Sequence, residues 1–219
     1  MNKFAYFVYI LNFILWKIGY KISIIYNKIK FSILLGEKCG KNFEVAGTLN
    51  LYFGSRKSVL SIGDDFHSLN GNFYNPLTRN SQGAIMVEEN GKIIIGNCVG
   101  MSSIMMRSHK SIIIGNYVNI GADCMILDTD CHSLNYLDRR TRGELDSANV
   151  ISSEIIIEDD VFIGARTIIM KGVRIGARSI IGAGSVITKD IPSDSIAAGN
   201  PCRVIKKVVD GENYLEFQQ

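Results

Sequence analysis

Residues 157–192 repeat a six-residue pattern without interruption, and this period constrains the fold more than any other feature. The units read IEDDVF, IGARTI, IMKGVR, IGARSI, IGAGSV and ITKDIP, with isoleucine at every first position and a small or β-branched residue at every fifth. A strict period of six does not match the 3.6-residue period of an α-helix, but it is typical of a solenoid whose units each form one side of a coil. The sequence predicts an all-β solenoid, a parallel β-helix, with first-position side chains directed at its axis.

Other features of the repeat support this architecture. A β-sandwich with a turn every six residues would not hold one register over six consecutive units. Glycine follows several first-position isoleucines, where a side chain would crowd the next coil or where a tight turn needs a permissive backbone. We expect the β-helix to occupy residues 37–207, with a tail at 208–219, because less regular units begin upstream at Ile62, Ile95, Ile114 and Ile120.

The regular pattern has one long interruption, which we call the excursion, at about residues 131–154. A solenoid accommodates such an insertion as a loop leaving one corner, and long loops in compact domains are usually functional. The excursion carries His132 near its start. An imidazole is the side chain best suited to accept a proton at neutral pH, so His132 is the candidate catalytic base.

The hexads, together with the stretch DTDCHS at residues 128–133, resemble the hexapeptide-repeat acyltransferases and in particular their polysaccharide and sugar O-acetyltransferases. The resemblance implies a left-handed β-helix and a homotrimer with active sites between subunits. It also implies that His132 is the base. Asp130, or alternatively Asp128, would orient the imidazole ring.

The end of the solenoid, VITKDIPSDSIAAGNPCRVIKK, resembles the closing segment of the same family, along which coenzyme A binds. Small residues would let the pantetheine arm approach the backbone, and basic residues would meet the phosphates. The resemblance implies a cofactor set of Ala165, Ala183, Thr188, Lys189, Arg203 and Lys206.

The acceptor side departs from the family pattern. Maltose and galactoside acetyltransferases carry an asparagine where this chain has Asp123, and the added charge changes the chemistry offered to the acceptor. On the excursion, Tyr136 and Arg139 are candidate contacts for an acidic or phosphorylated glycan. No metal is expected, because the three histidines are 42 and 23 residues apart and do not resemble the zinc ligands of a γ-type carbonic anhydrase on the same coil.

Residues 1–36 form a separate apolar and basic segment, which we expect to be helical. It contains five lysines and no acidic residue, since the first acid is Glu37. The uncharged run at residues 4–16 is shorter than the roughly 20 residues of a bilayer span, and the lysines and bulky residues after it do not fit a cleavable signal. We expect this segment to contact a membrane surface or to pack on the β-helix or on partner subunits. Nucleic acid is not an expected partner, because the remaining chain is slightly acidic.

These features together predict an acetyl-CoA-dependent O-acetyltransferase, acting by direct transfer on a sugar hydroxyl of a surface or capsular polysaccharide or of its lipid-linked precursor. Five scattered cysteines without paired spacing favour a reducing, cytoplasmic location, with peripheral contact at the inner face of the cytoplasmic membrane as an open alternative. Serine or amino-sugar acetylation is the alternative within the enzyme class. A non-catalytic hexapeptide scaffold is the alternative outside it.

Overall fold

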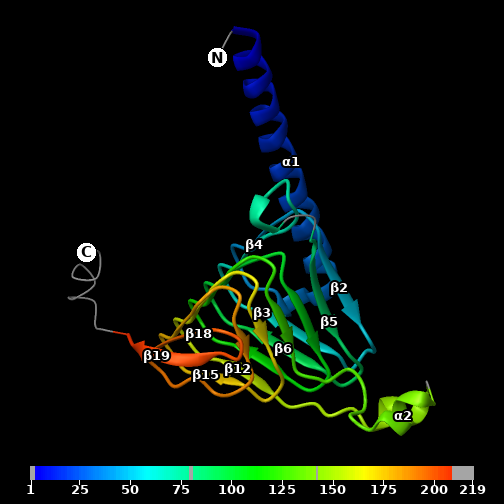
Figure 1. The fold of residues 1–219 in the computed structure, drawn as a ribbon. Helices are drawn as coiled ribbons and strands as arrows, with labels where there is room; N and C mark the ends of the chain where they lie inside the picture. Colours follow the sequence, from blue (N-terminus) through cyan, green and yellow to red (C-terminus); the bar gives the residue numbers. More distant parts are fainter. Residues whose placement is uncertain (1–2, 79–80, 142, 209–219) are drawn as a thin grey trace.

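The body of the molecule is a parallel β-helix with three flat sides (Figure 1). The computed structural model describes residues 3–78, 81–141 and 143–208. Each coil contributes one short strand to each of three sheets, and nearly all pairs between neighbouring coils are parallel. The exception is the last strand, which returns antiparallel to its predecessor and closes one sheet.

The strands follow the chain from sheet to sheet. The eight-stranded sheet contains, in spatial order, β1 (Glu44–Ala46), β4 (His67–Leu69), β7 (Gly100–Ser102), β10 (Asn119–Ile120), β13 (Phe162–Ile163), β16 (Ile180–Ile181), β18 (Ser195–Ala198) and β19 (Arg203–Lys207). The six-stranded sheet contains β2 (Leu49–Phe53), β5 (Gly83–Val87), β8 (Met105–Ser108), β11 (Met125–Leu127), β14 (Ile168–Ile169) and β17 (Val186–Ile187). The five-stranded sheet contains β3 (Val59–Ile62), β6 (Lys92–Ile95), β9 (Ile112–Ile114), β12 (Ile155–Ile157) and β15 (Arg174–Ile175).

The inward direction of the first-position isoleucines is confirmed. All six, from Ile157 to Ile187, are buried, and pairs such as Ile163 and Ile181 stand opposite each other in adjacent strands. The fifth-position residues are buried as well, so each unit contributes two side chains to the core. Buried hydroxyls at this position find backbone acceptors, as Thr167 Oγ1 donates to the Gly164 carbonyl at 2.8 Å. Burial without an unpaired polar group is what the repeat requires of these positions.

Where glycine occupies the second position of a unit, the next coil lies too close for a side chain. A Cβ on Gly164 would lie 2.4 Å from the Ala183 nitrogen of the next coil, so no side chain fits there. The tight turn instead falls two residues later, where Asp160, Arg166 and Arg178 have φ values of 60°, 59° and 57°. Of the two reasons considered for glycine at the second position, close approach therefore applies and backbone permissiveness does not.

The three edges of the prism are called corners below. The first corner joins the eight-stranded to the six-stranded sheet, as at residues 164–167. The second joins the six-stranded to the five-stranded sheet, and the excursion leaves the prism there with two short helices, α2 (Tyr136–Arg140) and α3 (Glu144–Ala148). The third corner returns the chain to the eight-stranded sheet. Short 3₁₀ turns occur at Gly36–Lys38 (η1) and Pro76–Thr78 (η2).

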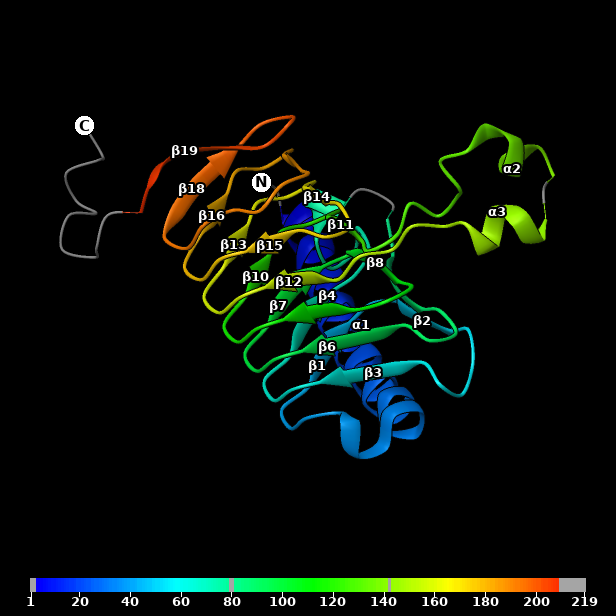
Figure 2. The same cartoon turned by 90° about the horizontal axis from the view of Figure 1, so that it is seen from below.

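The expected N-terminal helix is α1 (Lys3–Leu35), which packs on the first coil through its C-terminal half. Phe31 is fully buried, with its ring centroid 4.6 Å from that of Phe43. The buried amide of Asn27 donates to the carbonyls of Val45 and Gly47, each at 2.9 Å. In Figure 2 the helix lies at the end of the prism that carries β1 and β3, so it covers the first coil, which has no coil beneath it.

The Phe31 side chain is predicted to anchor α1. Phe31→Ala should lower the free energy of unfolding by about 3–5 kcal/mol, because it removes a fully buried ring. Ile33→Ala is the matched control, since Ile33 is 77% exposed on the same helix and should change stability by less than about 0.5 kcal/mol. Urea unfolding of both variants measures the difference, and equal losses would contradict this anchoring role.

Candidate active site

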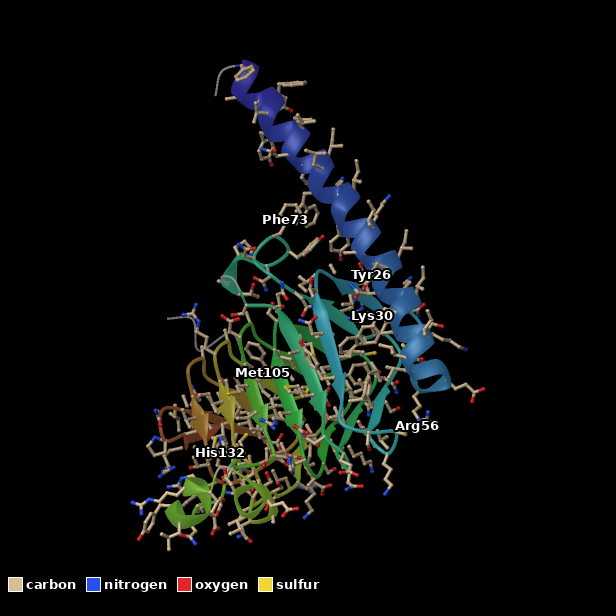
Figure 3. All side chains as sticks on the ribbon, turned by 90° about the vertical axis from the view of Figure 1, so that its right-hand side faces the viewer. Tyr26, Lys30, Arg56, Phe73, Met105 and His132 are labelled. Atoms are coloured by element: carbon tan, nitrogen blue, oxygen red, sulfur yellow. The ribbon has the colours of Figure 1, made fainter. Side chains whose placement is uncertain are left out.

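The excursion is fastened to the second corner before it leaves the prism. Thr129 and Ser152 form an antiparallel bridge across its base, and the Ser153 amide donates to the Asp128 carbonyl at 2.9 Å. Cys131 follows with a left-handed φ of 63°, which turns the chain so that His132 begins the outer part of the loop. Figure 3 shows His132 at the root of the segment that carries α2 and α3.

His132 is paired with a carboxylate from the returning side of the excursion. Its Nδ1 lies 2.8 Å from Oδ2 of Asp146, a residue of α3, while the other oxygen of Asp146 accepts the Ser133 amide at 2.8 Å. The His132 side chain is 69% exposed and that of Asp146 only 15%. An accessible imidazole is thus held from behind by a largely covered carboxylate.

The electrostatics of this pair define which ring nitrogen is available. Hydrogen bonds from His132 and from the Ser133 amide lower the pKa of Asp146 below its ordinary value. Asp146 is therefore ionised at neutral pH and can only accept, so Nδ1 donates to it and Nε2 is the ring nitrogen left for an acceptor hydroxyl. This is the arrangement that a general base requires.

A second carboxylate braces the loop that carries the pair. Asp138 in α2 accepts from the Ser133 hydroxyl at 2.8 Å and from the Asn149 side-chain amide at 2.9 Å, which links α2 to both ends of the excursion. Arg139 donates from Nη1 to the Ser133 carbonyl at 2.5 Å. These bonds fix the residue next to His132 and limit the freedom of the ring.

The structure places the two acids of the DTD stretch elsewhere, which corrects the expected orienting residue. Asp128 is fully buried and accepts from the backbone amides of residues 109–111, so it caps the corner of the preceding coil. Asp130 pairs with Lys171 of the following coil at 2.8 Å. Neither acid contacts His132, because the chain turns at Cys131 and sends the imidazole to the opposite side.

The sequence analysis missed Asp146 because it searched for an acid beside the histidine. Asp146 lies 14 residues away, and only the folding of α2 against α3 returns it to His132. An irregular loop has no period from which this contact follows. The available signal was an acid near the start of a short helical stretch inside the excursion.

A shallow depression of about 420 Å³ lies beside the pair, lined by His132, Arg139, Gly143, Asp146 and Ser147. Arg139, one of the expected acceptor contacts, is part of its wall. Tyr136 is exposed on α2 with the Arg140 guanidinium 5.0 Å from its ring centroid, outside this lining. Asp123 lies at the first corner with a left-handed φ of 59°, so one chain does not bring it to His132.

The expected cofactor residues divide between two corners. Ala165 and Ala183 occupy the first corner in successive coils, and Arg203 begins β19 opposite Ala198 at the end of β18. Lys206 is exposed further along β19, paired in register with Ile196. Thr188 and Lys189 instead follow β17 at the second corner, above the excursion. Within one chain the width of the six-stranded sheet separates the two groups.

Within the described ranges, no group of three or more His, Cys, Asp or Glu side chains is arranged to hold a metal ion. The cysteines at positions 39, 98, 124, 131 and 202 are all free thiols. The titratable groups that the structure brings together at His132 are the imidazole and the Asp146 carboxylate.

Comparison with known proteins identifies the class of fold. Residues 154–189 match the family model described as the hexapeptide repeat of succinyl-transferase. The solved structure of the polySia specific acetyltransferase NeuO is 28% identical, with a TM-score of 0.51, and the match covers 78% of this chain and 75% of that one. These similarities support the resemblance to the hexapeptide-repeat acyltransferases, and the coil is the left-handed parallel β-helix that this resemblance implies.

Two curated relatives cover shorter stretches. The galactoside O-acetyltransferase of Escherichia coli (strain K12) is 38% identical over 106 residues, which are 46% of this chain and 49% of that protein. The 2,3,4,5-tetrahydropyridine-2,6-dicarboxylate N-acetyltransferase of Staphylococcus aureus (strain Newman) is 51% identical over 55 residues, or 25% of this chain and 23% of that protein. The chain thus spans about half or less of the length of these relatives.

The orienting role of Asp146 is open to a direct test against the sequence expectation. Asp146→Asn should lower kcat for acetyl transfer by roughly 10- to 100-fold, a part of the 10²–10⁴ that a positioned base contributes. Asp130→Asn should leave kcat within about threefold of wild type, because Asp130 faces Lys171. Steady-state kinetics of both variants decide between the two carboxylates. A larger loss of kcat in Asp130→Asn than in Asp146→Asn would identify Asp130 as the residue that orients His132.

The same pair gives a pH dependence with a defined sign. Because the folded-state pKa of Asp146 is lowered, its contribution to the stability of the excursion is present above the ordinary carboxyl pKa and is lost as pH falls through the lowered value. Hydrogen exchange of the Ser133 amide should accelerate, after correction for intrinsic rates, at the acid end of this range. Asp146→Asn should remove that pH dependence.

Proposed function

We propose that this protein is an acetyl-CoA-dependent O-acetyltransferase that acts by direct transfer with His132 as general base. The observation that carries the proposal is the His132–Asp146 pair, whose exposed imidazole lies in the lining of an open depression. The similarity to a galactoside O-acetyltransferase and to the polySia specific acetyltransferase supports the same class of reaction.

The residues suit the proton movements of acyl transfer. As the acceptor hydroxyl attacks the thioester carbonyl, Nε2 of His132 takes the hydroxyl proton, and Asp146 stabilises the imidazolium that forms. When the carbon–sulfur bond breaks, the imidazolium returns the proton to the departing thiolate. The two steps together leave the enzyme as it began, so this route needs no acyl-enzyme and gives Cys131 no role as a nucleophile.

The first corner fits the arm of the donor. Ala165 and Ala183 are small residues in successive coils, where a pantetheine chain can lie close to the backbone. Arg203 and Lys206 on β19 supply positive charge for phosphates, and Thr188 and Lys189 supply a hydroxyl and a further charge from the second corner. Acetyl-CoA is the acyl donor substrate in this proposal.

The division of these groups supports a site shared by two copies of the chain. In a homotrimer the first corner of one subunit would face the second corner of its neighbour, which unites Ala183 with His132 across the interface. An apolar hollow of about 290 Å³ on the outer face of the eight-stranded sheet, lined in part by Met101, Ile120 and Phe162, offers a surface for that contact.

For the acceptor we propose a sugar hydroxyl of a surface or capsular polysaccharide, or of its lipid-linked precursor, reached in the cytoplasm. Arg139 in the wall of the depression suits an acidic glycan, with Tyr136 beside it and Asp123 supplied by a neighbouring copy. The similarity to an N-acetyltransferase keeps an amino-group acceptor as the second candidate. The His132–Asp146 pair favours an enzyme over a non-catalytic scaffold, because a scaffold does not require an exposed imidazole paired with a carboxylate.

Release of CoA from acetyl-CoA tests the proposed activity. His132→Ala should lower kcat by roughly 10² to 10⁴ with acidic glycan acceptors, while the rise in melting temperature produced by CoA persists because His132 does not bind the donor. Ala183→Phe should abolish that rise by filling the first corner. Unchanged turnover in His132→Ala would disprove the mechanism, and turnover only with amino acceptors would favour the second candidate.

Mixing variants tests the shared site. His132→Ala and Ala183→Phe chains, each inactive alone, should regain part of the wild-type activity when unfolded together and refolded as mixed trimers, because some interfaces then combine an intact His132 with an intact Ala183. Refolded single variants are the controls. If both residues act within one chain, mixing restores nothing.

A further inference from the structure

The outward side of α1 carries a continuous row of exposed apolar residues along the whole helix. This apolar ridge has spacings of three and four residues, so its members fall within an arc of about 100° on a helix that turns about 100° per residue. Their exposures lie between 44% and 77%, and they are Phe4, Phe7, Leu11, Ile14, Ile18, Ile22, Ile25, Ile29 and Ile33. The row, from Phe4 to Ile33, extends over roughly 45 Å at 1.5 Å per residue.

The ridge lies opposite the side that holds the helix on the protein. The Tyr20 hydroxyl donates to Glu44 at 2.6 Å, and Asn27 and Lys30 donate to backbone carbonyls of the first coil. These contacts are centred about 180° from the ridge at the same helical turn. Figure 3 shows side chains on the far side of α1 that project away from the sheets. The β-helix therefore occupies one side of α1 and leaves the other bare.

The charges beside the ridge are all of one sign. Lys17, Lys21 and Lys28 are exposed and lie on one flank, about 90° from the centre of the ridge. No acidic residue precedes Glu37, so the helix itself offers these ammonium groups no counter-charge. A bare apolar row with a lysine row at its edge is complementary to hydrocarbon bordered by phosphate.

We propose that α1 lies flat on an anionic lipid bilayer, with the apolar ridge inserted among the acyl chains and the three lysines at the lipid phosphates. By length and composition α1 is long and apolar enough to cross a membrane, but its C-terminal half is fixed against the first coil along one side. A ridge that continues along the docked half as far as Ile33 matches a helix held parallel to the surface. The β-helix then stands on the membrane with its first coil nearest the lipid.

A second copy of this chain fits the same surface less well. Two ridges packed antiparallel would bring their lysine rows to the same side without an intervening acid. An interface between copies would also leave unexplained why the N-terminal half of the helix, beyond its contacts with the prism, is exposed and apolar on most sides. Lipid satisfies both features.

Vesicle flotation with the full chain tests this placement. Wild type should float with phosphatidylcholine vesicles containing 30 mol% phosphatidylglycerol. Ile22→Asp/Ile29→Asp should lose at least 90% of that binding. Tyr117→Asp/Leu134→Asp is the matched control, because both residues are exposed apolar side chains on the body of the protein, and it should float as wild type does.

The lysines and the oligomeric state give independent readouts. Lys17→Gln/Lys21→Gln/Lys28→Gln should bind anionic vesicles about 100-fold more weakly, at roughly fivefold per lysine, while any binding to pure phosphatidylcholine is unchanged. Light scattering should give the same mass for the ridge variant as for wild type. A smaller mass, or equal flotation of ridge and control variants, would overturn the proposal and assign the ridge to a contact between copies.

The depth of a ridge side chain in the bilayer distinguishes a helix that lies flat from a helix that inserts only its N-terminal half. The chain has a single tryptophan, so Trp16→Phe/Ile25→Trp places the only indole on the ridge within the docked half. Lipids brominated near the head groups should quench its fluorescence. Unquenched emission from vesicle-bound protein would show that the docked half stays away from lipid and would refute the flat placement. None of these measurements depends on acetyl transfer.

Discussion

The stacking of one coil on the next is the interaction on which every other part of this structure depends. Each short strand pairs in parallel with the strand three coil sides further along the chain, and this places the isoleucines of successive coils against each other. A two-residue strand such as β14 has no stability of its own, so the sheet exists only because neighbours on both sides complete its hydrogen bonds and its burial. The period of six in the sequence follows from this stacking, because each strand must place its isoleucine against that of the neighbouring coil.

This architecture also determines where irregular structure is allowed. The strands tolerate no insertion, because one added residue would turn the inward side chains of that strand outward. A corner can open outward without disturbing the stack, provided that its base is closed. Asp128 provides that closure by accepting three backbone amides and a hydroxyl, so that a buried carboxylate is fully paired. The excursion that carries His132 is thereby attached to a closed corner of the coil.

The two ends of the solenoid are completed differently. At the last coil the chain turns back, and β19 pairs antiparallel with β18 along the edge of the eight-stranded sheet. At the first coil α1 covers the open core with Phe31 and satisfies strand carbonyls with Asn27 and Lys30. Covering the first coil uses only one side of α1. Its other side is free to carry a second property, which here is the apolar ridge.

The sequence by itself determined the β-solenoid architecture, because a run of similar units records the same contact many times, whereas the left hand of the coil was implied by the family resemblance. It also located the excursion and His132, since a break in a regular pattern is visible without a structure. The partner of His132 was decided only by tertiary structure, because Asp146 reaches the ring through the packing of α2 on α3 and no periodicity connects positions 132 and 146. The separation of Ala183 from His132 by the six-stranded sheet, and the outward direction of the ridge on α1, likewise follow from how elements are placed in space. Local sequence fixes what each element is, whereas its neighbours decide which of its faces remain available.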